Sequence, residues 1–325
     1  MKIKDKIKML LQEHIELSVK EITDWLQVSK QAVHIAINQL LENGEVFKLG
    51  KVPKTIYRLN NKQTPSAIIS TATADEIAFL QKQFLLITEM GEMKEGIEGF
   101  AIWCRQRKLP LEKTIAEFRT TKKKYEPYYC DGIIDGTDKL TNTKGYEKIF
   151  LDKVYYLDFY AIERFGKTRL GTLLHYAKQG QNKMLMGKIV EEIKPAMKNL
   201  LKKEKFEAVG FVPPTIRREV QIMKYLETHL KVNLPVVKLQ KISGIIPVPQ
   251  KSLSKLEERI TNAENTFAVS QTVKYNHVLL IDDAVGSGST LNQIAGKLKQ
   301  KAIAKKVTGL AVVGSFKGFD VVTDV

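Results

Sequence analysis

Residues 277–291, HVLLIDDAVGSGSTL, constrain the fold of this chain more than any other stretch. They begin with a continuous apolar run, which is typical of a strand buried on both faces of a parallel sheet. The run ends in two adjacent carboxylates, Asp282 and Asp283, which we expect at the carboxyl end of that strand, where open α/β sheets bind ligands. A glycine-containing turn follows and leads into a helix that the pattern predicts from Thr290 onwards.

The turn has the features of a phosphate-binding loop. Gly286 and Gly288 allow a close approach to the backbone, and Ser287, Ser289 and Thr290 add hydroxyl groups beside the unpaired N–H groups of a helix start. Because the two neighbouring carboxylates repel phosphate, we expect them to face another part of the ligand. A sugar phosphate meets both demands, since its vicinal hydroxyls donate to carboxylates while the loop holds the phosphate one sugar length away.

The second half of the chain alternates between strand-like and helix-like patterns. The expected strands are AVGFV, PVVKL, HVLLID and VTGLAVVG, with KVYYLDFYAIERF as an aromatic strand pair. The expected helices are RLGTLLHYAKQGQNKMLMGKIVEEIKPAMKNLLKKEK, as one helix or two, then RREVQIMKYLETHL and TLNQIAGKLKQK. Strands that alternate with helices predict an α/β domain over residues 130–325, with a mostly parallel sheet covered on both faces.

Residues 1–60 predict a separate unit of three helices and a hairpin. Apolar residues at helical spacing mark the first helix, and Ser18 with Glu21 forms a capping-box pattern at the start of the second. The third begins at Ser29 and ends at Asn43–Gly44. The sequence EVFKLGKVPKTIYRL then alternates, turns and alternates again, as the two strands of a ribbon do.

This order of helix, helix, short turn, helix and basic ribbon resembles the winged helix-turn-helix DNA-binding fold. The resemblance implies that the third helix enters the major groove while the hairpin contacts the phosphate backbone. The candidate DNA contacts are Lys30, Gln31, His34 and Asn38 on the helix and Lys48, Lys51, Lys54 and Arg58 on the hairpin. The alternatives are that the polar helix face is simply solvated, or that the unit serves in dimerisation or protein docking. Ten basic and seven acidic side chains give residues 1–60 a net charge of only +3, so charge does not decide between DNA binding and these alternatives.

Residues 61–129 are expected to connect this unit to the α/β domain. Residues 61–74 are polar and interrupted by proline, which predicts a linker. Three amphipathic segments then predict a small helical subdomain over residues 75–129, namely DEIAFLQKQFLLITEM, MKEGIEGFAIWCRQR and LEKTIAEFRTTKKKYEPY. Cys104 and Cys130 are too few for a zinc ribbon, so we expect both to serve in packing and expect no metal site in the protein alone.

The stretch quoted first closely resembles the signature of the type I phosphoribosyltransferases: four apolar residues, two acids, two apolar residues and a small-residue turn ending in Gly-x-Thr. It has neither the lysine of a P-loop nor the third glycine of a dinucleotide fingerprint. The resemblance implies that fold for the α/β domain. It also implies that Asp282 and Asp283 are the catalytic pair and hold the ribose hydroxyls of phosphoribosyl pyrophosphate, with Mg²⁺ bound through the substrate. The implied ligand-binding residues are Asp282, Asp283, Ala284, Gly286, Ser287, Gly288, Ser289 and Thr290.

Segments upstream are similar to the competence-associated ComF family of phosphoribosyltransferase-like proteins. They are residues 249–269, LLHYAKQGQ with its Lys-x-Gly, and VGFVPPTIRREVQ. This likeness implies a flap at residues 240–262 and a pyrophosphate loop with Pro214, Thr215, Arg217 and Arg218. The chain departs from that family because it has no N-terminal zinc ribbon. Gly286 also stands where purine-type enzymes place an acid, so we do not expect purine salvage.

A winged helix joined to a phosphoribosyltransferase domain is similar in architecture to the purine operon repressors of Gram-positive bacteria. The similarity implies a DNA-binding regulator whose effector is phosphoribosyl pyrophosphate or a related ribose-phosphate nucleotide. A Mg²⁺-dependent phosphoribosyltransferase with an unidentified acceptor remains an alternative, because sensor and enzyme need the same acid pair. An interaction component of a stress response is a third possibility. Because only one of these three functions is catalytic, the sequence leaves open whether the protein is an enzyme.

The net charge of +16 favours polyanionic partners without choosing among nucleic acid, phosphate-rich ligands and anionic membranes. The start of the chain, MKIKDKIKMLLQEH, has no uninterrupted apolar stretch, and no later segment has 18 apolar residues without a charge. We therefore expect a cytoplasmic protein without a membrane partner. We also expect a homodimer, since helix-turn-helix modules commonly bind paired half-sites.

Overall fold

The computed structural model describes residues 2–51, 54–60, 72–214, 216, 218–242, 253, 255–270 and 272–315. Most of the expected linker, the side chains of Lys51 and Lys54, and the residues Thr215 and Arg217 lie outside this description. The contacts divide the chain into two compact units. One unit is Met1–Thr73 with Thr88–Glu92, and the other is Ala74–Ile87 with Met93–Val325.

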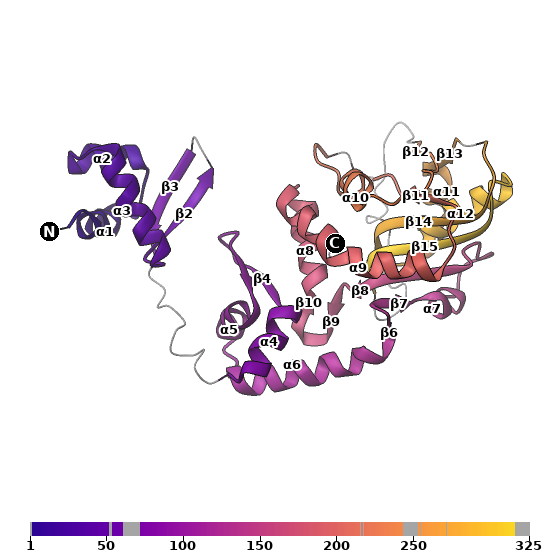
Figure 1. The fold of residues 1–325 in the computed structure, drawn as a ribbon, viewed down its shortest axis with the longest axis horizontal. Coiled ribbons are helices and arrows are strands. Elements are labelled where there is room, and N and C mark those ends of the chain that lie inside the picture. The colour runs from indigo at the N-terminus through magenta and orange to yellow at the C-terminus, as the bar shows by residue number, and fades with distance from the viewer. Residues whose placement is uncertain are drawn as a thin grey trace. The chain divides into compact units, whose positions relative to one another are not determined.

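The first unit consists of three helices and a three-stranded antiparallel sheet of order β1-β3-β2 (Figure 1). Its elements are α1 (Ile3–His14), β1 (Glu16–Leu17), α2 (Val19–Leu26), α3 (Lys30–Glu42), β2 (Val46–Lys51) and β3 (Lys54–Leu59). The predicted capping box is confirmed, because Ser18 accepts a bond from the backbone of Glu21 and the Glu21 side chain accepts one in return. Ser29 caps α3 in the same way that Ser18 caps α2, through a bond from a backbone N–H.

The second unit is a mixed α/β structure around a six-stranded, mostly parallel sheet of order β11-β14-β15-β8-β7-β6. The strands are β6 (Tyr129–Cys130), β7 (Ile133–Asp135), β8 (Lys153–Phe159), β11 (Ala208–Phe211), β14 (Tyr275–Val285) and β15 (Ala304–Gly314). The first four strands in the order are parallel, and β7 and β6 add an antiparallel edge. The expected class, α/β with a mostly parallel sheet, is therefore confirmed.

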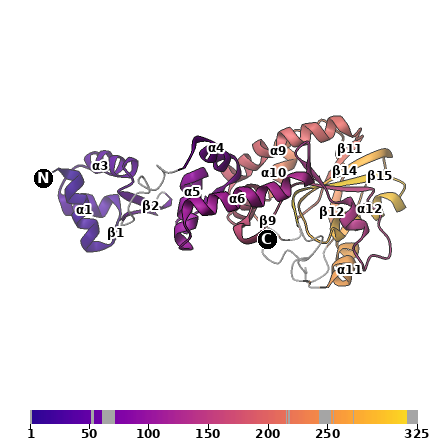
Figure 2. The same cartoon turned by 90° about the horizontal axis from the view of Figure 1, so that it is seen from below.

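Helices cover both faces of this sheet. They are α8 (Arg169–Gln179), α9 (Lys183–Lys203), α10 (Ile222–Leu230), α11 (Leu256–Thr266) and α12 (Ser289–Gln300). Leu279 and Ile281 of β14 form one apolar cluster with α8, α9 and α10. On the other face Leu291 of α12 packs over Gly309 of β15, where an added Cβ would lie only 3.0 Å from the leucine Cδ1. Figure 2 shows α9 and α11 on opposite sides of the strands.

The segment expected to be a helical subdomain also contains a hairpin, which corrects the prediction of a helix over residues 75–90. Its elements are α4 (Ala74–Gln83), β4 (Leu85–Ile87), β5 (Met93–Glu95), α5 (Gly96–Gln106) and α6 (Leu111–Tyr125). The helix stops because Phe84 packs against Phe100, Trp103 and Phe118, with ring centroids 4.9 to 6.2 Å apart. Packing between distant residues thus outweighs the local helical pattern.

Three further expectations need correction. KVYYLDFYAIERF is not a strand pair, because only Tyr160 separates β8 from β9 (Ala161–Ile162), too few residues for a hairpin turn. Instead β8 pairs with β7 and β15, and β9 pairs with β10 (Gly166–Lys167). PVVKL is not one full strand: Val236 makes a single parallel bridge to Val209 of β11, and only Leu239 belongs to β12 (Leu239–Lys241), which pairs with β13 (Phe267–Val269). Finally, Cys104 is buried as expected for packing, but Cys130 is exposed.

Short elements complete the described chain: a 3-10 turn at Glu126–Tyr128, α7 (Thr137–Thr141) and a 3-10 turn at Glu163–Phe165. Within the described residues, every helix is too short or too polar to cross a lipid bilayer.

Candidate functional site

The acid pair lies on β14, between its parallel neighbours β11 and β15. Phe211, the last residue of β11, pairs with Ile281, so Asp282 is the first residue of β14 beyond the end of that neighbour. Pairing with β15 continues to Val285, so the strand runs past the two acids instead of ending at them. The carboxylates therefore lie at the carboxyl edge of the sheet, beside the segment that follows β11.

A pocket of about 400 Å³ opens at this edge. It is lined by the end of α8, the segment after β11, parts of α11 and β13, and the turn between β14 and α12. The lining residues that matter most are Lys178, Pro214, Arg218, Arg259, Asp282, Asp283, Ala284, Gly286, Ser287, Gly288, Ser289 and Thr290. The structure thus brings the acid pair, the glycine-containing turn and two of the expected pyrophosphate-loop residues into one cavity.

The turn between β14 and α12 depends on glycine and two buried serines. Gly288 is the N-cap of α12 and has a φ of 76°, a left-handed conformation that glycine adopts at little cost. Ser287 and Ser289 are buried with their hydroxyl oxygens 2.9 Å apart, and the Ser289 N–H donates to Ser287 Oγ at 3.4 Å. The two hydroxyls therefore stabilise the turn. The first N–H groups of α12 adjoin the pocket, the arrangement by which helix starts bind phosphate.

Two side chains join this turn and the start of α12 to a segment far away in the sequence. Tyr146 donates its hydroxyl hydrogen to the Ser287 carbonyl at 2.5 Å, and burial raises the pKa of Tyr146. Asn292 is fully buried in α12. Its Oδ1 accepts hydrogen bonds from the N–H groups of Phe150 at 2.7 Å and Leu151 at 3.2 Å. Its Nδ2 donates to the Lys148 carbonyl at 3.0 Å. Sequence reasoning missed both residues, because nothing local to them indicates a partner about 140 positions away.

The opposite wall of the pocket is cationic. Lys178, near the end of α8, forms an ion pair with Asp283, with Nζ 2.5 Å from Oδ2. Arg218 donates to the Lys178 carbonyl and, at 3.2 Å, to Gln179 Oε1. Gln221 donates its amide to the Arg218 carbonyl at 3.0 Å, so these hydrogen bonds join the end of α8 to the segment after β11.

A second arginine adds positive charge to the pocket from α11. Arg259 is 7% exposed, its Nε donates to the Leu253 carbonyl at 2.8 Å, and burial lowers its pKa. Sequence reasoning did not select Lys178 or Arg259 as site residues. Both nevertheless fall in segments that carry the family resemblance, the Lys-x-Gly stretch and residues 249–269. That resemblance was the available signal.

The predicted DNA-contacting side chains lie on the surface of the first unit. Lys30, Gln31, His34 and Asn38 are all exposed on α3, and Lys48 is exposed on β2. Arg58 is half-buried and forms an ion pair with Glu16 of β1, with Nη2 2.5 Å from Oε2. The guanidinium of Arg58 is thus already neutralised within the unit, so this residue is a weaker candidate for a phosphate contact than Lys48.

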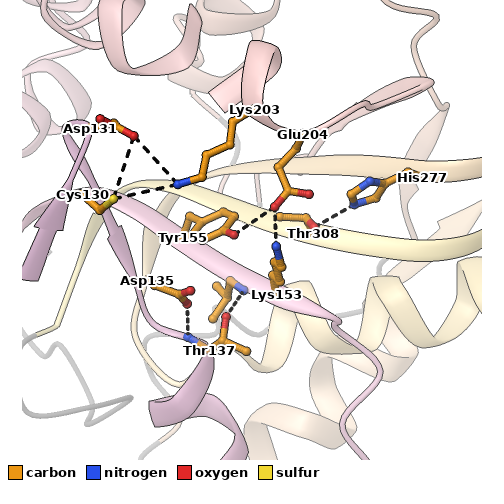
Figure 3. Close-up of polar contacts among 11 residues, drawn as sticks. Cys130, Asp131, Asp135, Thr137, Lys153, Tyr155, Lys203, Glu204, His277 and Thr308 are labelled. Atoms are coloured by element: carbon orange, nitrogen blue, oxygen red, sulfur yellow. Dashed lines mark hydrogen bonds and ion pairs between the residues drawn. The ribbon is translucent and has the colours of Figure 1, made fainter. Parts of the chain in front are cut away.

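A separate polar cluster occupies the amino edge of the sheet (Figure 3). Glu204 accepts hydrogen bonds from Lys153 and from the Tyr155 hydroxyl, the latter at 3.1 Å. His277, on β14, lies 2.9 Å from the Thr308 hydroxyl, and burial lowers its pKa. Because parallel α/β sheets bind ligands at their carboxyl edge, we assign this cluster to stability.

Comparison of the sequence with protein-family models and with curated proteins finds no match.

Proposed function

We propose that this protein is a DNA-binding regulator whose α/β unit has the type I phosphoribosyltransferase fold and binds phosphoribosyl pyrophosphate or a related ribose-phosphate nucleotide. One observation carries the proposal: a single pocket contains adjacent carboxylates, a helix-start turn suited to phosphate, and a cationic wall. Carboxylates suit the ribose hydroxyls, the turn suits the 5-phosphate, and the cations suit a pyrophosphate. A ligand that has all three groups in this order matches the pocket.

The arrangement of the first unit supports the regulatory part of the proposal. Its order of helix, strand, two helices and a two-stranded ribbon fits a winged helix, with α3 as the recognition helix. Its exposed polar side chains, Gln31 and Asn38 among them, suit the edges of bases. Ligand binding would regulate DNA affinity if two conformations bind the ligand differently, with a typical coupling of about 1–3 kcal/mol.

Calorimetric titration of the full chain with phosphoribosyl pyrophosphate and Mg²⁺ tests the ligand site. We expect saturable binding that weakens at least about tenfold in Asp282→Asn and in Asp283→Asn, because each loses a charged acceptor for a hydroxyl. Asp24→Asn is the matched control, since Asp24 is exposed in α2 of the other unit. Equal affinities for all three variants and the unaltered protein would remove the acid pair from the site.

Gel shifts over a series of salt concentrations test DNA binding. Affinity should fall by about 0.9 log units per log unit of salt for each phosphate neutralised. Gln31→Ala and Asn38→Ala should each lose about 1–3 kcal/mol of sequence discrimination, whereas Gln12→Ala, on the exposed surface of α1, should not. Binding that is insensitive to salt and to both α3 variants would contradict the proposal.

An active transferase is the second candidate, favoured by the acid pair itself. No group of three or more His, Cys, Asp and Glu side chains within the described residues could hold a metal ion. Two carboxylates next to a diphosphate ligand fit Mg²⁺, which usually binds through a few carboxylates and substrate phosphates. Bound there, the ion would neutralise charge on the departing pyrophosphate. Release of pyrophosphate with any acceptor, abolished in Asp282→Asn and Asp283→Asn, would establish the enzyme.

A further inference from the structure

An ion pair joins Lys178 of α8 to Asp283 of β14. Both side chains line the pocket and are only 19% and 13% exposed. An ion pair this shielded from solvent is screened less than one on the surface. One of the two carboxylates assigned to sugar hydroxyls is therefore already neutralised before a ligand binds.

The backbone of Lys178 is held by a hydrogen bond, whereas its side chain borders the open space of the pocket. Arg218 donates to the Lys178 carbonyl and to the neighbouring Gln179 side chain, which ties the end of α8 to the segment after β11. Four methylene groups separate this fixed backbone from the ammonium group. The ammonium can therefore leave Asp283 by side-chain rotation alone. The same pocket is also lined by Pro214 and Arg218, two of the expected pyrophosphate-loop residues.

A neutral diol is a poor replacement for Lys178 at Asp283. If hydroxyls displace the ammonium, a partly buried charge loses its partner, and an unpaired buried charge is strongly unfavourable. A ligand that also carries a second anionic group offers the ammonium a new partner in the same pocket. The cost of breaking the ion pair is then offset only for the ligand with both features.

We propose that Lys178 is a specificity-determining residue: it exchanges its bond to Asp283 for a bond to a diphosphate group, so that the pocket selects sugar phosphates with a diphosphate over simple sugar phosphates. The inference rests on the proposed function, because it assumes that the pocket binds a ribose phosphate. It goes further by assigning to Lys178 the discrimination between phosphoribosyl pyrophosphate and ribose 5-phosphate.

Calorimetric titration of the full chain with each of these two ligands tests the inference. In Lys178→Met we expect phosphoribosyl pyrophosphate to bind about tenfold more weakly and ribose 5-phosphate about tenfold more tightly. The preference for the diphosphate then falls about a hundredfold, equal to about 2.7 kcal/mol. Lys183→Met is the matched control, because Lys183 is an exposed residue at the start of α9, and it should leave both affinities unchanged.

The opposite signs separate a specific role from a general loss of charge or of folding. Equal weakening of both ligands in Lys178→Met and Lys178→Gln, or no change in either, overturns the inference and leaves the proposed function intact. Tighter binding of ribose 5-phosphate cannot come from a misfolded variant. If the unaltered protein binds neither ligand, the proposed function fails, and the inference fails with it.

Discussion

Asn292→Ala is the substitution with the largest effect that we expect near the pocket. Asn292 is fully buried and makes three hydrogen bonds to the backbone of residues 148–151. A hydrogen bond contributes about 0.5–1.5 kcal/mol to stability, and buried backbone groups left without partners add to the loss. We therefore expect the free energy of unfolding of the second unit to fall by about 2–4 kcal/mol.

Urea unfolding followed by tryptophan fluorescence measures this loss. The chain has two tryptophans: Trp103 is 5% exposed in α5 of the second unit, and Trp25 is 59% exposed in the first. A Trp25→Phe background leaves Trp103 as the reporter of the second unit. Asn265→Ala in the same background is the control, because Asn265 is exposed on α11 and its amide donates only within that helix.

The control should change the unfolding free energy by no more than about 0.5 kcal/mol, as is usual for surface sites. If Asn292→Ala costs no more than Asn265→Ala, the hydrogen bonds between α12 and residues 148–151 do not stabilise the fold, and the reasoning is refuted.

Three further predictions concern the turn, the core and the sheet edge. Tyr146→Phe removes the hydrogen bond to the Ser287 carbonyl, so it should lower the free energy of unfolding in urea by about 1 kcal/mol and weaken the binding of phosphoribosyl pyrophosphate. An unchanged calorimetric affinity for that ligand would show that the turn does not need this hydrogen bond. Gly171→Ala, in α8, would put a Cβ 2.1 Å from the Tyr160 carbonyl oxygen and should cost about 1–3 kcal/mol, so an unchanged thermal midpoint would contradict this close approach of α8 to Tyr160. Burial lowers the pKa of His277 below its unfolded value of 6.5, so the unfolded state binds the proton more readily and stability should fall as the pH drops below about 6.5. His277→Gln should remove that part of the pH dependence, and parallel curves for the two proteins would exclude His277 as its source.

Local signals predicted much of the fold. The capping box at Ser18 and the N-cap at Ser29 depend only on residues within one helical turn, and both are present. The apolar run before Asp282 also predicted a buried parallel strand, because a strand covered on both faces needs apolar side chains in both directions.

The errors arose where distant residues decide the structure. Phe84 ends a helix because aromatic rings from α5 and α6 surround it, and no pattern around residue 84 indicates them. The helix α11 was missed because its polar sequence resembles a loop until Ala263 and Arg259 are buried. In the pocket, the acid pair and the turn are contiguous and could be predicted, whereas Lys178 and Tyr146 reach it only through folding. Asn292 is close to the turn in sequence, but its partners at residues 148–151 reach it only in the folded chain.

The bonds from Tyr146 and Asn292 also bear on how the protein is made. They join segments 141 to 144 positions apart, so a nascent chain that has completed β8 must wait for β14 and α12 before the turn can be tethered. Contacts of such high contact order form slowly, because a long loop must close first. The helices and hairpin of residues 1–60 make their contacts across much shorter loops, such as the 42 positions between Glu16 and Arg58, and can fold earlier. A newly synthesised chain would thus complete its N-terminal unit before it completes the pocket at the carboxyl edge of the sheet.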